Sequence, residues 1–293
     1  MKSTMQSPPL LISQMLRYGT TVHADQKVCT WTGDGTREMS FRQVGEQAAQ
    51  LAHALRGLGI TGDQRVATFM WNNAEHMVAY LAVPSMGAVL HALNIRLFPP
   101  QLIYAAKHAR NQVVIVDNVL AQSFAGMLPD IPTIKHVIVN GPIDDATRQA
   151  LAGIEHVEAV YDYHEFISGH PTSFDWPEDL DENSASSVCY TSGTTGNPKG
   201  VVYSHRGNYL HAMGVFASLG MHQGDHALVV VPLFHANAWG FPYTAMLAGV
   251  SLVMPGRFLQ AEPLAKMIEA EKVTFGAGVP TIWNDLLQYL DTH

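Results

Sequence analysis

Hydrophobic residues recur along the chain with two periods, one typical of amphipathic helices and one typical of buried strands. The clearest helical stretch begins at Ser40, which forms a capping-box pattern with Gln43, and it ends near Gly57 and Gly59. Further helices are predicted at 73–86, from 99, from 204, and at 240–248, 261–271 and 280–290. Short apolar runs predict strands at 66–70, 89–91, 113–117, 136–140, 187–190, 201–203, 227–231, 250–254 and 273–275.

This alternation of strands and helices predicts an α/β fold with sheets flanked by helices. Residues 141–183 are more polar and contain scattered prolines, and we interpret them as a joining region. We therefore expect two α/β subdomains, at 1–183 and 184–293.

Composition narrows the class of protein. Of the 293 residues 47% are hydrophobic and only 14% are charged, which indicates a large buried core and excludes intrinsic disorder. The net charge of −8 argues against a nucleic-acid partner, which would require a basic face. Two cysteines cannot build a disulfide framework, and no secretory signal is visible at the start. We expect a cytoplasmic protein.

One segment, residues 227–256, contains no Asp, Glu, Lys or Arg and is long enough to cross a bilayer. A membrane-spanning protein is therefore one hypothesis. Pro232, His235, Asn237 and Pro242 interrupt the segment, however. A buried strand–loop–helix–strand unit is the preferred interpretation, because buried parallel strands appear as continuous apolar runs.

A Rossmann-type glycine spacing at Gly57, Gly59 and Gly62 lies in the wrong context. A dinucleotide-binding loop follows a strand and opens a helix, whereas these glycines end a helix and precede a strand. The end of a helix carries negative partial charge and would repel phosphate.

A second glycine-rich segment, residues 190–200, follows an apolar strand and has the chemistry of a phosphate-binding loop. Gly193 and Gly196 leave backbone N–H groups open to an oxyanion, and Lys199 adds a positive charge. Four side chains bring hydroxyl groups: Thr191, Ser192, Thr194 and Thr195. The alternative is a polar surface loop without a ligand.

The same segment is not a Walker A motif. Pro198 stands where that motif requires its second glycine, and Gly200 follows Lys199 in place of the hydroxyl residue that holds Mg²⁺. This excludes kinases and GTPases of the P-loop class.

Residues 190–200 resemble the phosphate-loop signature of the adenylate-forming superfamily, which contains acyl-CoA synthetases, luciferases and the adenylation domains of peptide synthetases. Residues 231–240 resemble its acyl-site motif, 276–281 its acyl-pocket segment, and 91–97 an element near the substrate face. The resemblance is greatest to medium- and long-chain fatty acyl-CoA synthetases. It implies the large N-terminal domain of that fold.

The resemblance implies a two-step reaction with ATP, Mg²⁺ and coenzyme A. A carboxylate and ATP give an acyl-adenylate and pyrophosphate, and the thiol of coenzyme A then gives the thioester and AMP. Thr191 would help to hold Mg²⁺, and the loop from Ser192 to Lys199 would wrap the β- and γ-phosphates, with Lys199 also catalytic. His235 would lie near the carboxylate under attack, and its alternative is a core histidine bonded to backbone.

The acyl side of the site rests on the same resemblance. Trp239 would gate the acyl channel, or simply pack in the core, and Gly276 and Gly278 would line the pocket. Because residues 227–256 offer no acid to pair with an ammonium group, an amino-acid substrate is disfavoured. A fatty acid is expected, with a short-chain or aryl acid as the alternative.

Family members continue beyond residue 293 into a small C-terminal domain with a catalytic lysine. We therefore expect an N-terminal fragment that lacks this domain and is inactive alone. A hypothesis of another class is an inactive nucleotide- or partner-binding fragment. The resemblance also suggests a homodimer through the N-terminal part and peripheral membrane association, without a transmembrane segment.

Overall fold

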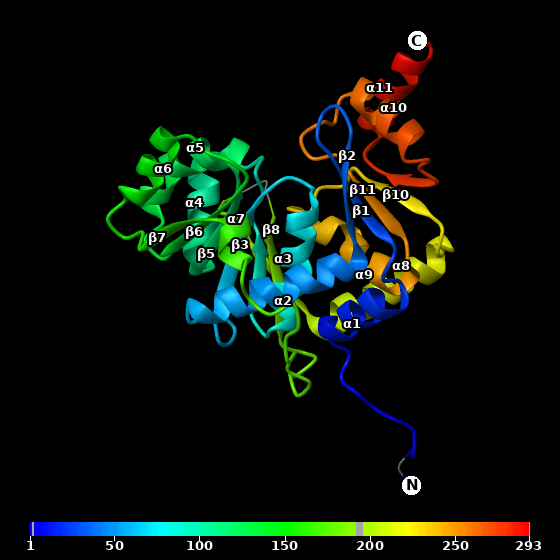
Figure 1. Cartoon of the computed structure of the whole chain (residues 1–293), viewed down its shortest axis with the longest axis horizontal. Helices are drawn as coiled ribbons and strands as arrows, with labels where there is room; N and C mark the ends of the chain where they lie inside the picture. Colours follow the sequence, from blue (N-terminus) through cyan, green and yellow to red (C-terminus); the bar gives the residue numbers. More distant parts are fainter. Residues whose placement is uncertain (2, 192–195, 293) are drawn as a thin grey trace.

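A helix with no exposed face lies at the centre of the molecule. All 12 residues of α3 (Ala74–Ser85) are buried, and the helix contacts β1 of one sheet and β3, β4 and β8 of the other. Asn73 caps it, as predicted, by accepting a hydrogen bond from the His76 backbone N–H. Figure 1 shows the computed structural model, which describes residues 1, 3–191 and 196–292.

The larger sheet has the strand order β7-β6-β5-β3-β4-β8-β9, in which every pair is parallel except β8 with β9. Because parallel strands end at the same edge, the loops after β3, β5 and β8 all begin at one edge of the sheet. Its strands are β3 (Arg65–Phe69), β4 (Val89–Ala92), β5 (Asn111–Asp117), β6 (His136–Asn140), β7 (Ala159–Asp162), β8 (Ala185–Tyr190) and β9 (Gly200–Ser204).

The smaller sheet has the order β12-β10-β11-β1-β2, parallel except for the β1–β2 hairpin. Its strands are β1 (Lys27–Trp31), β2 (Thr36–Ser40), β10 (His226–Val229), β11 (Ser251–Met254) and β12 (Phe275–Ala277). Each sheet draws strands from both sides of the predicted boundary at 183/184. The division into subdomains at this boundary therefore stays a prediction, and it does not coincide with the division into two sheets.

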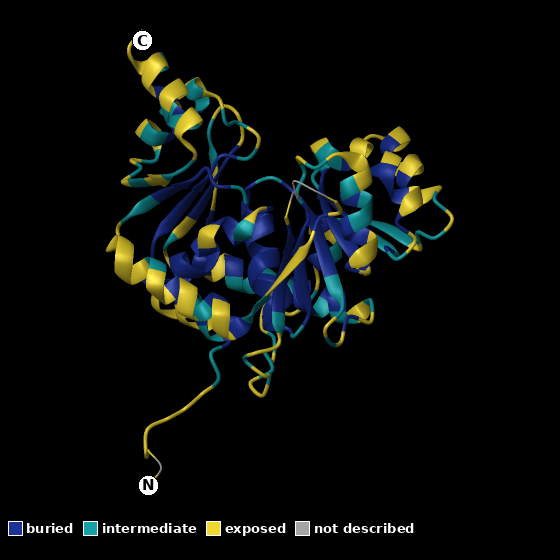
Figure 2. Cartoon of the chain, turned by 180° about the vertical axis from the view of Figure 1, so that it is seen from behind, coloured by how far each residue is buried: buried dark blue, intermediate teal, exposed yellow. Residues whose placement is uncertain are grey.

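Helices cover both faces of the sheets, so the predicted α/β class is confirmed (Figures 1 and 2). One core cluster joins α1, α2, α3 and α9 to both sheets, a second packs α4 and α5 on the far face of the larger sheet, and a third packs α10 and α11 on the smaller sheet. The helices are α1 (Ile12–Val22), α2 (Phe41–Gly57), α4 (Pro99–His108), α5 (Asn118–Met127), α6 (Asp145–Ala152), α7 (Tyr163–Ile167), α8 (His205–Leu219), α9 (Phe241–Ala248), α10 (Ala261–Ala270) and α11 (Pro280–Leu290), with short 3-10 turns at η1 (Leu128–Asp130) and η2 (Ala236–Gly240).

The prediction of a joining region at 141–183 was wrong. This stretch forms α6, β7 and α7, and β7 extends the larger sheet beside β6. The strand is short and only partly buried, so it lacks the apolar run that revealed its neighbours. The side chains of Asp144 and Asp162 cap the two helices, which is a signal that the sequence did contain.

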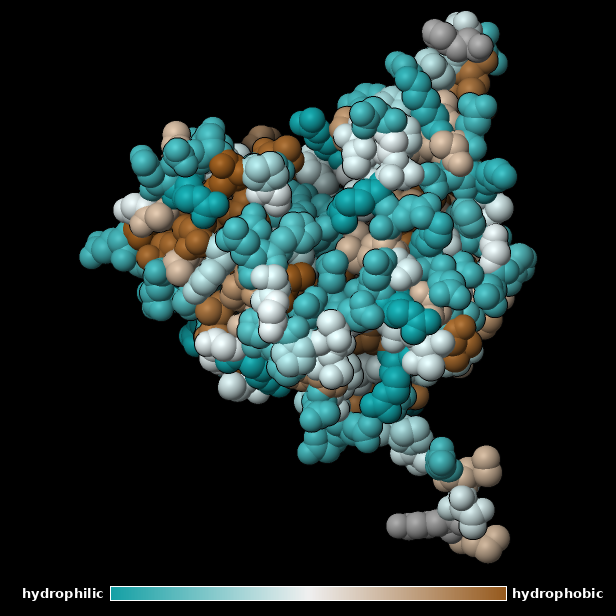
Figure 3. All heavy atoms as spheres, in the orientation of Figure 1, coloured by the Kyte–Doolittle hydropathy of each residue, from teal (hydrophilic) through white to brown (hydrophobic). Residues whose placement is uncertain are grey.

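The uncharged stretch at 227–256 folds as strand, turn, helix and strand, as preferred from the sequence. Within the described residues, no helix combines the length and apolar character that crossing a bilayer would require. The last predicted strand is displaced, because β12 occupies Phe275–Ala277 and not 273–275. In the space-filling view of Figure 3, polar side chains cover most of the face and the surface dips between the two upper lobes.

Candidate active site

Residues 190–200, here called the phosphate hairpin, join β8 to β9 as an antiparallel pair. The Thr191 backbone N–H donates to the Lys199 carbonyl at 2.9 Å, and the Lys199 N–H donates to Thr191 Oγ1 at 3.4 Å. Gly196 has a φ of +84°, which glycine adopts without strain. The side chains of Thr191 and Lys199 are exposed. Four predicted ligands, Ser192, Gly193, Thr194 and Thr195, lie outside the described residues.

Tyr190 anchors the base of this hairpin. A Cβ on Gly200 would lie 3.0 Å from the tyrosine ring, which is tighter than an ordinary van der Waals contact, so glycine suits this close approach. The Tyr190 hydroxyl shares a 2.7 Å hydrogen bond with Nδ1 of His108 on α4, and burial raises the pKa of the phenol. The start of the hairpin is therefore fixed to the helix beside it.

Residues 231–240, the acyl-site segment, leave β10 through a left-handed turn. Ala236, Asn237, Ala238 and Trp239 have φ values of 46°, 51°, 47° and 53°, and Gly240 continues the run at 76°. Left-handed backbone is unfavourable for residues with a Cβ, so consecutive residues in this region require strong external support. His235 and Trp239 flank the turn and are exposed, Trp239 by 47%. The alternatives of a core histidine and a core tryptophan are therefore wrong.

Asn237 supplies that support and is itself only 3% exposed. Its Nδ2 donates to Ser187 Oγ at 3.2 Å and to Asn208 Oδ1 at 3.4 Å, and its Oδ1 accepts from the Cys189 thiol at 3.4 Å. Burial raises the pKa of Cys189 to about 11, so the thiol keeps the proton that it donates. The turn is thereby docked on β8, the strand that leads into the phosphate hairpin.

Two further side chains, one from the loop after β3 and one from α3, hold the acyl-site segment. Asn72 follows β3, and its Nδ2 donates to the carbonyls of Val229 and Val231 at 2.7 and 2.9 Å. Its Oδ1 accepts the Leu233 N–H at 2.9 Å. The buried Tyr80 hydroxyl of α3 donates to the Leu233 carbonyl. The exit of β10 is therefore fixed from both sides.

The motif at 91–97 also reaches this segment. The Arg96 guanidinium lies 5.8 Å from the centre of the Phe234 ring, and the Trp71 ring meets the same phenylalanine edge-on at 6.3 Å. A cation over an aromatic face is weakly attractive. Two motifs that are far apart in the sequence therefore meet beside His235.

Gly276 and Gly278 make room for the indole of Trp283. A Cβ at Gly276 would lie 3.0 Å from this ring and a Cβ at Gly278 would lie 3.3 Å from it. The Trp283 Nε1–H donates to the Gly278 carbonyl at 3.3 Å. Both glycines thus lie at the edge strand β12, and their observed contact is with Trp283.

A separate hollow of about 590 Å³ lies where β1, β3, β5 and β6 end. Burial raises the pKa of Asp117 on its wall to about 6, although Asn140, the Trp71 N–H and Asn73 donate hydrogen bonds to the carboxylate and oppose this rise. Glu75, 1% exposed, pairs with Arg37 at 2.7 Å. The two acidic side chains on the wall of this hollow, Asp117 and Glu75, thus have partners within the protein.

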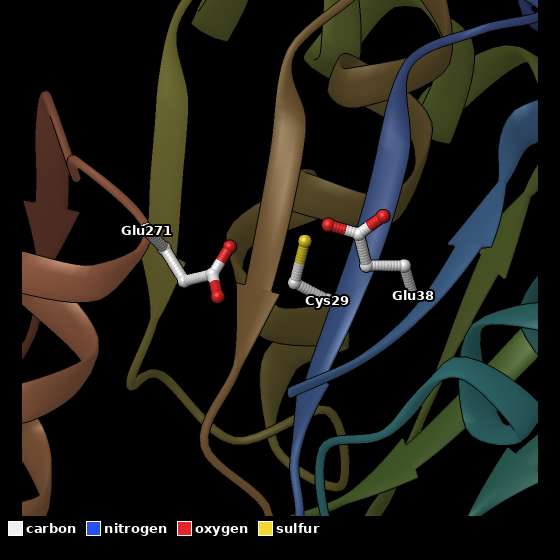
Figure 4. A group of neighbouring side chains, drawn as sticks. All are labelled: Cys29, Glu38 and Glu271. Carbon is white, nitrogen blue, oxygen red and sulfur yellow. The ribbon is translucent and has the colours of Figure 1, made fainter. Parts of the chain in front are cut away.

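Cys29, Glu38 and Glu271 bring three metal-ligating atoms within 4.8 Å of one another (Figure 4). Burial and the Glu271 carboxylate raise the pKa of Cys29 to about 12, so the thiol is protonated. Lys27 pairs with Glu38 at 2.6 Å, and the Thr36 hydroxyl donates to Glu271 at 2.6 Å. These partners account for the group without a metal ion.

A profile of the family described as AMP-binding enzyme matches residues 18–293. The chain belongs to this family. The 3-methylmercaptopropionyl-CoA ligase of Ruegeria pomeroyi is 39% identical over 290 residues, which cover 98% of this chain and 52% of that protein. The medium-chain-fatty-acid–CoA ligase of Ectopseudomonas oleovorans is 37% identical over 291 residues, with 98% and 52% covered. The chain thus spans about half the length of the curated relatives it matches.

Solved structures agree on the fold of this family member. An anthranilate CoA ligase in complex with anthranoyl-AMP superposes with a TM-score of 0.82 at 26% identity, covering 97% of this chain and 52% of that one. A long-chain-fatty-acid-CoA ligase of Archaeoglobus fulgidus gives 0.83 at 20% identity, with 100% and 56% covered. The second likeness shows the fold alone. The predicted adenylate-forming fold is confirmed.

The structure unites the predicted phosphate hairpin and acyl-site segment through residues that the sequence analysis did not single out as site residues. Asn72, Tyr80 and Asn208 support the site from three different elements or loops. Asparagines and a tyrosine within apolar stretches of the sequence could have indicated buried hydrogen bonds, since buried polar groups need partners. Their partners could not be found without the fold.

Proposed function

We propose that the chain is the ATP- and acid-binding part of an AMP-forming acyl-CoA ligase. The observation that carries this proposal is the docking of the acyl-site segment on β8, through Asn237, directly before the phosphate hairpin. A carboxylate held beside His235 would meet a nucleotide held by the hairpin. Attack of a carboxylate oxygen on the α-phosphorus would form the acyl-adenylate and break the bond to pyrophosphate.

The phosphate hairpin would bind the leaving pyrophosphate. Lys199 offers an exposed ammonium group, and a positive charge at this place stabilises the charge that develops as pyrophosphate leaves. Thr191 is exposed, and its Oγ1 accepts a long hydrogen bond from the Lys199 backbone N–H. A hydroxyl oxygen suits Mg²⁺, which prefers oxygen ligands and retains several waters, so this residue fits the predicted ion. Bound Mg²⁺ would neutralise phosphate charge.

The acyl-site segment would bind the acid. His235 has an exposed imidazole at the start of the turn, where it can donate a hydrogen bond to a carboxylate or phosphate oxygen. Trp239 presents an indole that is 47% exposed, an apolar plate suited to an uncharged acyl chain. Coenzyme A would then accept the acyl group, with loss of AMP, as in the ligases that this chain resembles.

We infer a fatty acid as substrate, with a short-chain or aryl acid as the alternative. Relatives named for medium-chain and long-chain fatty acids support the first, at 37% and 35% identity. One named for 3-methylmercaptopropionyl-CoA and a structure named for anthranilate support the second.

The test is ATP–pyrophosphate exchange by the longest gene product that contains this chain, with straight-chain acids of two to sixteen carbons and with benzoate. Exchange that grows with chain length supports the fatty-acid assignment. A maximum with the shortest acids or with benzoate supports the alternative, and no exchange with any acid contradicts the ligase proposal.

A second proposal concerns the 293-residue chain by itself. It spans about half of its relatives, and we propose that it binds nucleotide or a second copy but does not complete the adenylation. Light scattering would measure its mass, and the same exchange assay would measure its activity. Acyl-adenylate formation by the isolated chain would contradict the proposal. Cell fractionation would test the predicted cytoplasmic location and peripheral membrane association.

A further inference from the structure

The left-handed turn of the acyl-site segment has an unfavourable backbone conformation that its surroundings must stabilise. Four residues with positive φ precede Gly240. Ala236, Ala238 and Trp239 do not favour positive φ, whereas an asparagine such as Asn237 tolerates it. Such backbone persists only where its surroundings enforce it. His235 and Trp239, the residues proposed to hold the acid, stand at the two ends of this turn. Whatever enforces the turn therefore sets the direction of both side chains.

The Asn237 amide has every hydrogen-bonding position in contact with a partner. Its Nδ2 reaches Ser187 and Asn208, and its Oδ1 faces the Cys189 thiol and the Tyr80 hydroxyl, both at 3.4 Å. The network is buried, so an unmade bond cannot be replaced readily by water.

The partners of Asn237 on β8 show which face of the strand the turn contacts. Ser187 and Cys189 are two residues apart and therefore point to the same face of the strand, and Thr191 is the next position in that alternation. One amide thus spans the last two same-face positions before the phosphate hairpin. Asn208 of α8 completes the frame, since its Nδ2 donates to Ser186 Oγ at 3.0 Å and to Ser187 Oγ at 3.3 Å.

We propose that Asn237 is a positioning residue that locks the left-handed turn onto β8 and so fixes His235 and Trp239 relative to the phosphate hairpin. This inference rests on the proposed function of the site. It assigns to Asn237 no contact with substrate. Its loss weakens binding of the acyl part of the ligand and leaves binding of ATP unchanged, because the base of the phosphate hairpin is held separately by Tyr190 and His108.

The test compares Asn237→Ala with Asn237→Gly in the 293-residue chain. Both variants lose the side-chain bonds, but glycine keeps the preference for positive φ. Calorimetry measures the Kd of a non-hydrolysable acyl-sulfamoyl adenosine and of ATP. We expect both variants to weaken the acyl analogue on the order of tenfold and to change ATP binding less than about twofold. Asn183→Ala, at an exposed asparagine in a turn, is the matched control.

Three outcomes would overturn the inference: unchanged affinity for the acyl analogue in Asn237→Ala, full rescue by Asn237→Gly, or equal losses for the analogue and for ATP. Ser187→Ala should weaken the analogue in the wild-type background and weaken it less in Asn237→Ala, because the bond between the two side chains is already lost there.

Hydrogen exchange separates a failure of this inference from a failure of the proposed function. If the wild-type chain binds neither ligand, the function is contradicted. The inference is then judged by amide exchange over residues 233–245, which should accelerate in Asn237→Ala by more than the loss of global stability measured by urea unfolding accounts for. Unchanged exchange in this peptide would overturn the inference on its own.

Discussion

The phosphate hairpin and the acyl-site segment meet at β8 but are held in different ways. The hairpin is tied at its base, by the Thr191–Lys199 backbone pair and the Tyr190–His108 bond, and its described polar side chains face solvent. The acyl-site segment is tied along its length by buried amide and hydroxyl groups, among them Asn72 and Asn237. The proposed function accounts for this difference. Exposed donors in the hairpin would be available to a charged ligand, whereas the buried polar groups of the acyl-site segment bond to one another and to the backbone.

The largest expected effect comes from the exposed side of this comparison. The double variant Thr191→Ala/Lys199→Ala should reduce ATP–pyrophosphate exchange by the longest gene product that contains this chain about 10²–10³-fold, because the proposed function places both groups beside the developing charge. Stability should change by less than about 0.5 kcal/mol, because both side chains are exposed. Lys266→Ala, which removes a charge from a surface ion pair on α10, is the control. An unaltered exchange rate in the double variant would contradict the role of the hairpin.

The second largest effect is a pH dependence of stability caused by Asp117. This buried carboxyl group ends β5, at the edge of the larger sheet where β8 also ends. Its folded pKa of about 6 exceeds the ordinary 3.8, so between these values the folded state binds more protons than the unfolded state. Stability should therefore fall as pH rises through this window, by up to about 3 kcal/mol. Urea unfolding at pH 4, 5, 6 and 7 measures the slope, and Asp117→Asn should flatten it.

Asp144→Asn provides the control for this pH series. Asp144 caps α6 at the surface, and hydrogen bonds from the Thr147 backbone lower its pKa. Its contribution has the opposite sign, being present above its unfolded pKa and lost as pH falls. The free energy of unfolding could depend on pH equally in Asp117→Asn and in the wild type between pH 4 and 6. That result would mean that Asp117 is already ionised at pH 4, and it would contradict the raised pKa.

A third effect measures the support of the acyl-site segment. Tyr80→Phe removes the hydroxyl that donates to the Leu233 carbonyl and leaves a buried acceptor unpaired. We expect a loss of about 1–2 kcal/mol in the free energy of unfolding, measured with urea. Tyr163→Phe is a closely matched control, because Tyr163 is fully buried and its hydroxyl has no hydrogen-bond partner among the described residues. Equal effects of the two changes would contradict the proposed support.

The smallest effect concerns the backbone of the hairpin. Gly196→Ala places a Cβ at a φ of +84° and should cost about 1 kcal/mol. Gly214→Ala on the exposed side of α8 meets nothing within 4 Å and should stabilise by about 0.5–1 kcal/mol. Opposite shifts of the melting temperature are expected from two identical substitutions. A stabilising Gly196→Ala would mean that the loop does not require its left-handed residue.

The sequence predicted most of the fold because long parallel strands and capped helices leave local signals. Ser40 and Asn73 began the predicted helices, and the apolar run at 227–231 was a buried strand. Two of the missed strands lack such a signal: β7 is only partly buried, and β1 joins its sheet by pairing with β11, more than 200 residues later.

The candidate site likewise had one part that could be predicted from the sequence and one part that could not. The hydroxyls and Lys199 of the hairpin were visible because their chemistry is concentrated in one short segment. The left-handed turn was not, because its cause lies in Ser187, Cys189 and Asn208, which reach Asn237 only in the folded chain. Tertiary hydrogen bonds override the preference of two alanines and a tryptophan for right-handed backbone.

The most direct test of the central claim is calorimetric titration of the 293-residue chain with an acyl-sulfamoyl adenosine of medium chain length. If the hairpin and the acyl-site segment form one site, the chain should bind one equivalent, and shortening the acyl chain should weaken binding stepwise by about 0.8 kcal/mol per methylene that is fully buried. Absence of binding, or an affinity indifferent to both acyl length and Trp239→Ala, would contradict the claim that the two segments form one acyl-adenylate site.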